Sequence, residues 1–219
     1  MECNRMEIAR NTKGRLAKRM LDIVVSIVLL VLAAPLLMIV AALLRLQIGG
    51  PTLFRQHRTG QGGRQFTIVK LRTMTDSRDA RGNLLPDGQR CSGLGLLVRR
   101  ASIDELPQLI NVLRGDLSLV GPRPLLPRYD PWYTDRERLR FAVPPGITGL
   151  AQINGRNGLA WDERLALDVR YVERWSFRLD LWILLRTVRK VFGGSDVAAD
   201  PSAVMLDLDE ERMSTWVRV

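Results

Sequence analysis

The chain has 219 residues, of which 46% are hydrophobic and 26% are charged. This length is typical of one compact domain with an appendage, and the composition excludes an intrinsically disordered chain. The formal net charge of +10 favours an anionic partner, and nucleic acid, lipid head groups and phosphorylated small molecules are all candidates. Two distant cysteines and a single histidine lack the spacing of a zinc site or a disulfide, so we expect a reducing compartment.

The first element is an apolar run over residues 23–44, which contains no charged side chain. As a helix it reaches about 33 Å, enough to cross a hydrocarbon core of about 30 Å. A cleaved signal peptide is shorter and ends in small residues, whereas this run continues to Arg45. Pro35 lies near the middle and bends a helix, because it lacks a backbone N–H and clashes with the preceding turn.

The flanks of this run leave its membrane topology open. Six basic residues lie on each side, so the positive-inside rule gives no orientation. A re-entrant helix–break–helix that enters and leaves one membrane face agrees with this balance, and a straight single-pass anchor with a tolerated proline is the alternative. Asp22 lies at the edge of the run, where a charge is costly, and we expect a local ion pair with Lys18 or Arg19.

The middle of the chain mixes one strand with short helices. The β-branched residues 66–71 predict a strand, and the polar, glycine-rich residues 75–95 predict a surface loop. Apolar residues recur at helical spacing over 102–114, and Gly115 ends that helix. The further elements expected, in chain order, are a rigid loop at 120–124, a short basic helix at 136–141, a turn at 144–146 and a helix at 161–175.

The last predicted helix carries an apolar stripe opposite basic residues. The stripe consists of Leu181, Leu184, Leu185, Val188 and Phe192. Such a helix can lie in the lipid interface, or it can be the last core helix with a solvated face. The acidic, small-residue-rich tail from Ser195 onward is expected to be loose.

Two adjacent carboxylates, Asp104 and Glu105, are the strongest candidates for chemistry. They follow Arg99 and Arg100, and they lie at the predicted start of a helix. Ser102 and Glu105 match a capping box; alternatively the helix begins at Asp104. In both cases the positive helix end and the arginines keep a carboxylate ionised and attract phosphate. A simple helix cap with complementary charges is the competing interpretation.

Other basic residues stand where phosphate ligands would. Lys70 and Arg72 end the predicted strand, Arg123 is held between two prolines, and Arg156 lies in a glycine- and asparagine-rich segment. Each is a weak signal alone. Together they can surround a diphosphate and neutralise the charge that develops in phosphoryl transfer.

Five stretches of the chain resemble the small monotopic phosphoglycosyl transferases, which belong to the bacterial sugar transferase family. They are Lys18-Arg-Met-Leu-Asp22, Lys70-Leu-Arg-Thr-Met74, Ser102-Ile-Asp-Glu-Leu-Pro107, Leu119-Val-Gly-Pro-Arg-Pro124 and Pro145-Gly-Ile-Thr-Gly-Leu-Ala-Gln-Ile-Asn-Gly-Arg-Asn157. The resemblance runs from about residue 15 to residue 192. Family members often carry Ser-Pro at the helix break, whereas this chain has Ala34-Pro35.

The resemblance implies a mostly helical α/β fold with a re-entrant membrane helix, interfacial helices and a small cytoplasmic catalytic domain. The implied division is an N-terminal tail (1–15), the re-entrant helix (16–47), the catalytic domain (48–194) and a C-terminal tail (195–219). The implied location is the cytoplasmic face of the bacterial inner membrane.

The resemblance also implies a reaction. A sugar 1-phosphate moves from a UDP-sugar to polyprenol (undecaprenyl) phosphate and UMP is released, which is the first membrane step of glycoconjugate assembly. Asp104 would be the nucleophile that carries the phosphosugar, and Glu105 would hold Mg²⁺. The implied phosphate, nucleotide or polar ligands are Lys70, Arg99, Arg123, Arg156 and Asp168.

The identity of the sugar is less constrained than the reaction. Similarity to enzymes that start N-glycan assembly favours an N-acetylated amino sugar, although glucose and galactose users share these motifs. Downstream glycosyltransferases are further expected partners. The alternative function is a membrane-tethered nucleic-acid-binding protein, but the sequence has no recognisable binding motif and few aromatic residues near its arginines.

Overall fold

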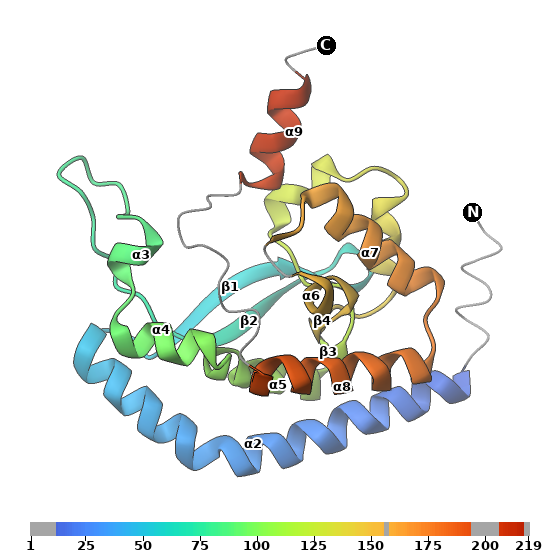
Figure 1. The fold of residues 1–219 in the computed structure, drawn as a ribbon, viewed down its shortest axis with the longest axis horizontal. Coiled ribbons are helices and arrows are strands. Elements are labelled where there is room, and N and C mark those ends of the chain that lie inside the picture. The colour runs from blue at the N-terminus through green and yellow to red at the C-terminus, as the bar shows by residue number, and fades with distance from the viewer. Residues whose placement is uncertain (1–11, 156–157, 194–205, 217–219) are drawn as a thin grey trace.

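The computed structural model describes residues 12–155, 158–193 and 206–216. Within them, helices predominate over two small sheets (Figure 1). The helices are α2 (Thr12–Ile48), α3 (Asp87–Arg90), α4 (Gly93–Arg100), α5 (Leu109–Arg114), α6 (Leu150–Asn154), α7 (Trp161–Glu173), α8 (Phe177–Gly193) and α9 (Leu208–Trp216). The 3-10 helices are η1 (Gln61–Gly63), η2 (Ile103–Gln108), η3 (Pro127–Trp132) and η4 (Glu137–Ala142). The strands are β1 (Leu53–Thr59), β2 (Gln65–Leu71), β3 (Ser118–Val120) and β4 (Gly146–Thr148).

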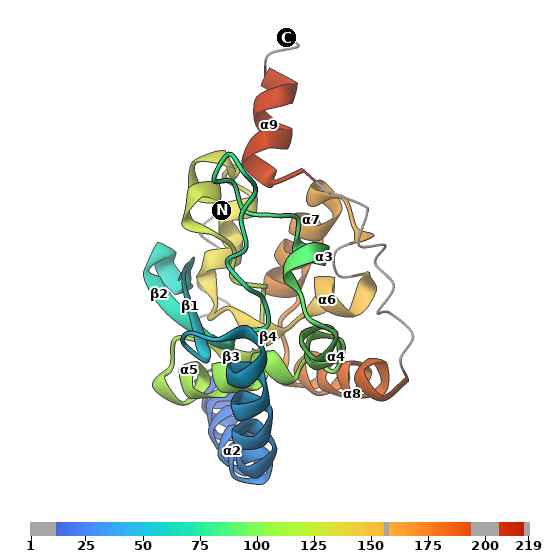
Figure 2. The same ribbon diagram turned by 90° about the vertical axis from the view of Figure 1, so that its left-hand side faces the viewer.

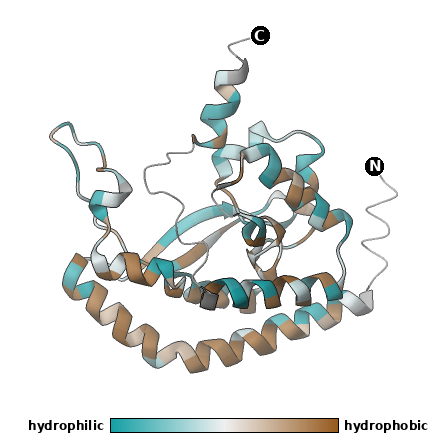
Figure 3. Cartoon of the chain, in the orientation of Figure 1, coloured by the Kyte–Doolittle hydropathy of each residue, from teal (hydrophilic) through white to brown (hydrophobic). Residues whose placement is uncertain are grey.

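Helix α2 contains the apolar run and is apolar along most of its length (Figure 3). It is one continuous helix of 37 residues with Pro35 inside it, so the helix–break–helix expected there is instead one helix with an internal proline. Figure 1 shows α2 as an arc whose ends lie close to the rest of the domain and whose middle lies farthest from it. Only 11% of its most apolar window is buried, which distinguishes α2 from a core helix covered by other elements.

Buried polar contacts attach the N-terminal half of α2 to the domain. Asp22 accepts hydrogen bonds from the Ser118 hydroxyl (2.8 Å) and the Leu119 N–H (3.0 Å). Lys18 forms its salt bridge with Asp180 (2.8 Å), and Arg19 donates to carbonyl oxygens at the end of α5. The local ion pair expected for Asp22 is therefore replaced by long-range contacts. Two hydrogen-bond donors compensate the burial of this carboxylate.

The strands form two separate two-stranded sheets. β1 and β2 are antiparallel, and β2 confirms the strand predicted at 66–71. β3 and β4 are parallel and place residues 118–120 beside residues 146–148, so the segment expected as a turn at 144–146 leads into β4, which begins at its last residue. The predicted surface loop 75–95 is only partly correct, because α3 and the start of α4 fall within it.

The main core lies between α5, the β3–β4 pair, α7 and α8, and includes Val112, Leu119, Tyr171 and Ile183. A second cluster joins α2 to α4 and β2 through Leu44, Val98 and Leu71, among other residues. In Figures 1 and 2, α4, α5 and α8 lie at one level between α2 and the rest of the molecule.

Helix α8 combines features of both interpretations of its apolar stripe. Ile183 is fully buried in the main core, and Leu184 packs partly against it. Leu181, Leu185 and Val188 remain exposed on the outside of the same helix. α8 is thus a core helix that also presents an apolar surface, and contact of that surface with lipid stays a prediction.

Candidate active site

The two carboxylates lie on η2, between α4 and α5, rather than on a regular α-helix. Ser102, immediately before η2, has a left-handed backbone with a φ of 56°, the one non-glycine residue with positive φ in the described ranges. It makes no side-chain cap, so the capping box predicted with Glu105 is not formed. A left-handed non-glycine residue is strained, and it turns the chain sharply just before Asp104.

Glu105 instead points toward two basic side chains. Its Oε1 accepts hydrogen bonds from Lys70 Nζ (2.6 Å), at the end of β2, and from Arg123 (3.3 Å). Burial alone would raise the pKa of Glu105, but the charges of Arg123 and Lys70 outweigh burial and bring the pKa to about 2. Glu105 is therefore ionised throughout the physiological pH range. No protein partner of Oε2 is found among the described residues.

Asp104 has a different electrostatic environment. Burial and the neighbouring charge of Glu105 raise its pKa, whereas Lys70 and Arg99 oppose that shift. Arg99 is exposed at the end of α4, where it contacts the Met74 sulfur (3.2 Å). Two neighbouring carboxylates with pKa shifts of opposite sign suit two different roles.

The position of Arg123 depends on close packing between two loops. Gly121 lies so close to the facing loop that an added Cβ would be 2.4 Å from the Pro144 carbonyl oxygen. An added Cβ at Gly146 would be 2.0 Å from the Gly121 nitrogen. Only glycine allows this approach, and it holds the following Pro-Arg-Pro segment, with Arg123, next to Glu105.

Asp168 is connected to the carboxylate pair and its cations only indirectly. It is 1% exposed, and its Oδ2 accepts a hydrogen bond from Arg140 (2.8 Å). Arg140 also donates to the backbone carbonyl of Arg123 (2.6 Å) and to the Tyr133 hydroxyl (2.9 Å). The structure thus connects Asp168 to Arg123 through a buried arginine. Direct contact between Asp168 and a substrate stays a prediction.

Two further arginines near the site were not recognised in the sequence. Arg58, on β1, is partly buried; burial and the charge of Arg123 lower its pKa to about 10. Arg164, on α7, is 8% exposed, and burial followed by the charge of Arg123 lowers its pKa. Residues 53–59 show no regular alternation of apolar and polar side chains, so little in the sequence points to β1 or to Arg58.

The structure brings together five of the predicted site residues: Lys70, Arg99, Asp104, Glu105 and Arg123. The three cations exceed the two carboxylates in charge, before Arg58 and Arg164 are added. A site of this kind favours a ligand with several negative charges, such as a diphosphate. Arg156, the remaining predicted ligand, lies outside the described residues.

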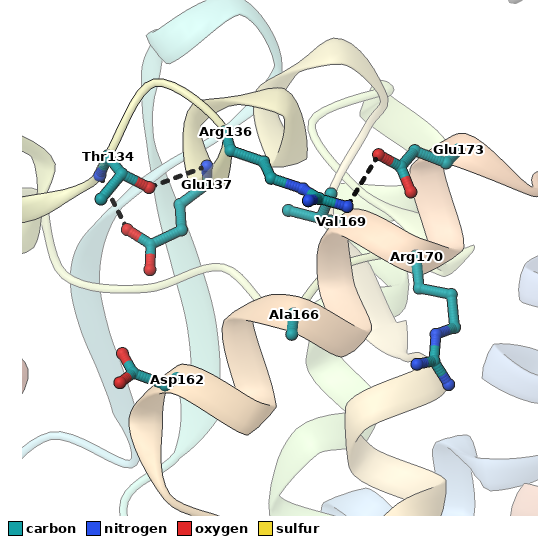
Figure 4. A pocket seen from close by; sticks show the side chains of 8 residues that line it. All are labelled: Thr134, Arg136, Glu137, Asp162, Ala166, Val169, Arg170 and Glu173. Atoms are coloured by element: carbon teal, nitrogen blue, oxygen red, sulfur yellow. Dashed lines mark hydrogen bonds and ion pairs between the residues drawn. The ribbon is translucent and has the colours of Figure 1, made fainter.

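A cavity of about 320 Å³ lies elsewhere, between η4 and α7 (Figure 4). It contains none of the predicted site residues. An Arg136–Glu173 ion pair (3.5 Å) lines one side, and Thr134 and Glu137 cap each other on the other. Four of its five charged residues form ion pairs, Arg136 with Glu173, and Glu137 and Asp162 with Arg212 of α9, so we place the chemistry at the carboxylate pair instead.

Known proteins match this chain over most of its length. The sequence model of the bacterial sugar transferase family matches residues 13–194. An uncharacterised sugar transferase of Bacillus subtilis (strain 168), EpsL, is 56% identical over 80% of this chain and 86% of its own length. The UDP-glucose:undecaprenyl-phosphate glucose-1-phosphate transferase of Caulobacter vibrioides is 46% identical, over 79% of this chain and 68% of its own length.

Another relative is named for a different sugar. The undecaprenyl-phosphate galactose phosphotransferase of Salmonella typhimurium is 37% identical over 81% of this chain and 41% of its own length. The alternative prediction, a nucleic-acid-binding protein, finds no support in these matches.

Proposed function

Because the chain belongs to the bacterial sugar transferase family, we propose that it moves a sugar 1-phosphate from a UDP-sugar to undecaprenyl phosphate and releases UMP. The named reactions of the Caulobacter and Salmonella relatives support this assignment. The observation that carries it is the carboxylate pair, with Lys70 and Arg123 on Glu105 and with Arg99 close to Asp104.

In the first step, an Asp104 oxygen attacks the β-phosphorus of the UDP-sugar. A bond forms between the carboxylate and phosphorus while the bond from the β-phosphorus to the bridging oxygen breaks, and UMP leaves with that electron pair. In the second step, a phosphate oxygen of undecaprenyl phosphate attacks the same phosphorus and releases Asp104 as a carboxylate. Covalent catalysis divides one difficult displacement into two easier ones.

The different environments of the two carboxylates support separate roles. Burial raises the pKa of Asp104, and a more basic carboxylate is the better nucleophile once it is ionised. Lys70, Arg99 and Arg123 stabilise the charge that develops on the phosphoryl oxygens. Glu105, with its low pKa, remains an anion that keeps Lys70 and Arg123 in position.

Mg²⁺ fits this group of residues. Magnesium sites commonly take one or two carboxylates and complete their ligands with water and substrate phosphates. Glu105 has one oxygen without a partner among the described residues, and no group of three or more metal-binding side chains occurs in those residues. Glu105, with Asp104 beside it, would hold the ion, which when bound would neutralise charge on the diphosphate.

Helix α2 supports the proposed membrane location. We propose that it is re-entrant, because both ends of its arc lie close to the domain and its exposed side chains include Val31, Leu32 and Met38. Exposed Leu96 and Leu97 on α4, and Leu185 on α8, would then contact the inner-membrane interface. Since η2 joins α4 to α5, the carboxylates would face lipid-anchored undecaprenyl phosphate from the cytoplasmic side.

A labelling experiment tests this topology. With the native cysteines replaced, single cysteines are placed at Arg15 and Gln47, near the two ends of α2. In intact cells, a membrane-impermeant maleimide is expected to label neither position, whereas both should react after the inner membrane is opened. Labelling of one flank from the periplasm would show that α2 spans the membrane.

The reaction is tested by UMP release from purified protein, undecaprenyl phosphate and Mg²⁺. The panel of donors includes UDP-glucose, UDP-galactose and UDP-N-acetylated amino sugars, the class favoured by resemblance to N-glycan initiators. Wild-type protein should release UMP with at least one donor and carry a sugar phosphate on Asp104, detected by mass spectrometry after quenching. Asp104→Asn should lose both signals, and capture of the sugar phosphate by this variant would exclude Asp104 as the nucleophile.

The metal role of Glu105 needs a separate titration. Glu105→Gln removes the charge but keeps the size of the side chain, so it should raise the Mg²⁺ concentration needed for half-maximal UMP release. An unchanged Mg²⁺ titration curve would show that Glu105 does not hold the ion.

A further inference from the structure

The C-terminal segment, residues 206–216, docks on the catalytic domain although it lies beyond the match to the family at 13–194. It contains α9, which stands next to η3 and the start of α7 in both views (Figures 1 and 2). The loose tail expected from Ser195 onward is therefore wrong for this segment, while residues 194–205 lie outside the described ranges.

An apolar anchor holds the segment. Leu208 is 0% exposed and belongs to a buried cluster with Tyr129, Tyr133, Trp161 and Leu165, among others. The Trp161 indole N–H donates to the carbonyl oxygen of residue 206 (2.9 Å). Complete burial of a leucine side chain is favourable because it removes apolar surface from water, so this docking is more than an incidental surface contact.

Charged contacts fix the orientation of the segment. Asp207 accepts a hydrogen bond from the Tyr129 hydroxyl (2.5 Å) and forms a salt bridge with Arg128. At the other side of α9, Arg212 bridges Glu137 (2.8 Å) and Asp162 (2.7 Å), two residues that border the cavity of Figure 4. The segment thus ties η3, η4 and α7 together.

The residues that the segment holds are connected by contacts to an arginine near the active site. The Tyr129 and Trp161 rings meet edge to face, with centroids 5.4 Å apart. On Trp161, the Arg164 guanidinium lies 4.4 Å from the ring centroid, within the range of a cation–π contact. Arg164 is in turn close enough to Arg123 for the two charges to interact.

From this chain of contacts we infer that the C-terminal segment is a positioning element for the substrate-binding arginines. It fixes Trp161, and Trp161 holds Arg164 near Arg123. The two arginines are then in place to bind the diphosphate of the nucleotide sugar. The inference rests on the proposed function. The segment itself touches no reacting group, so its loss should weaken binding of the donor more than it slows the chemical steps.

The test compares point variants of the full chain. Leu208→Asp places a charge in the apolar anchor and should detach the segment, whereas Leu208→Met keeps an apolar side chain of similar size. Met213→Gln changes a 47% exposed residue on the same helix and serves as the control. Hydrogen exchange of residues 127–132 and 161–168 should become faster in Leu208→Asp only, while exchange in α5 stays at its wild-type rate.

The kinetic measurement separates positioning from a general loss of folding. Leu208→Asp should raise KM for the UDP-sugar and the Kd for UDP about tenfold while kcat changes less than about twofold. Leu208→Met and Met213→Gln should retain wild-type values. If Leu208→Asp is fully unfolded, Arg212→Gln, which removes only the peripheral bridge, should give a smaller rise in the same KM.

The outcomes distinguish this inference from the proposed function. Absence of UMP release by the wild-type protein with every donor would overturn the proposed function. With an active wild-type enzyme, faster exchange in Leu208→Asp without a rise in KM or in the Kd for UDP would overturn the positioning role alone. A fall confined to kcat would overturn it as well.

Discussion

Replacing Asp168 by asparagine removes one charge from a buried ion pair and leaves Arg140 charged. The side chains of the pair are 2% and 3% exposed, and their atoms lie 2.8 Å apart. Asparagine keeps the size of the side chain and one acceptor, but it does not compensate the guanidinium charge. Removing one partner of a buried ion pair costs about 3–5 kcal/mol. For a domain of this size, that loss lowers the melting temperature by roughly 6–20 °C.

The corresponding double variant should behave differently. Replacing Arg140 by methionine and Asp168 by leucine removes both charges, and apolar substitution of a whole buried pair is often neutral. We therefore expect the double variant to be more stable, by about 2 kcal/mol, than the summed effects of Arg140→Met and Asp168→Leu made singly. Thermal unfolding of purified protein, followed by tryptophan fluorescence, measures all of the variants under one condition.

The same variants test how Asp168 contributes to the reaction. Because Arg140 also binds the backbone carbonyl of Arg123, Asp168→Asn should lower kcat/KM together with stability. A variant that loses activity but unfolds within about 0.5 kcal/mol of the wild type would refute this reasoning. That result would favour direct contact between Asp168 and the substrate.

Two further changes probe the electrostatics and the backbone of the site. Arg99→Gln removes a positive charge that opposes the raised pKa of Asp104, so the acidic limb of the pH–kcat/KM profile should move to higher pH. Arg100→Gln is the control. An acidic limb that does not move in Arg99→Gln, or that moves equally far in Arg100→Gln, would contradict this prediction. Gly121→Ala places a Cβ 2.4 Å from a carbonyl oxygen of the facing loop and should destabilise the protein by about 1–3 kcal/mol, with loss of UMP release. Gly88→Ala, which meets nothing within 4 Å, is the control, and equal melting temperatures for the two variants would refute the steric argument.

Local patterns predicted several elements correctly. The β-branched run at 66–71 forms β2, and Gly115 ends α5 in a left-handed conformation with a φ of 92°. The helix predicted at 161–175 is α7. Such features depend on residues a few positions apart, so they can be read from the chain. β1 was missed because its charged and exposed residues obscure the alternation of a strand.

The candidate site was predicted mainly from short motifs, and five of the seven predicted residues proved to be neighbours. The sequence did not show which hydrogen-bond and ion-pair partner each side chain would have. Ser102 and Glu105 match a capping box, but Glu105 pairs with Lys70 and Arg123, which are 35 and 18 positions away. A partly buried carboxylate gains more from two cations than from one backbone N–H.

The chemical character of this protein was present in its residue types: an apolar run long enough for a membrane, an adjacent pair of carboxylates and an excess of arginine. Long-range packing decided the rest. It connected Asp22 to Ser118, Asp168 to Arg140 and Leu208 to the cluster around Trp161. Burial removes water from such groups, and each then takes the partner that the folded chain brings within reach, however distant that partner is in the sequence.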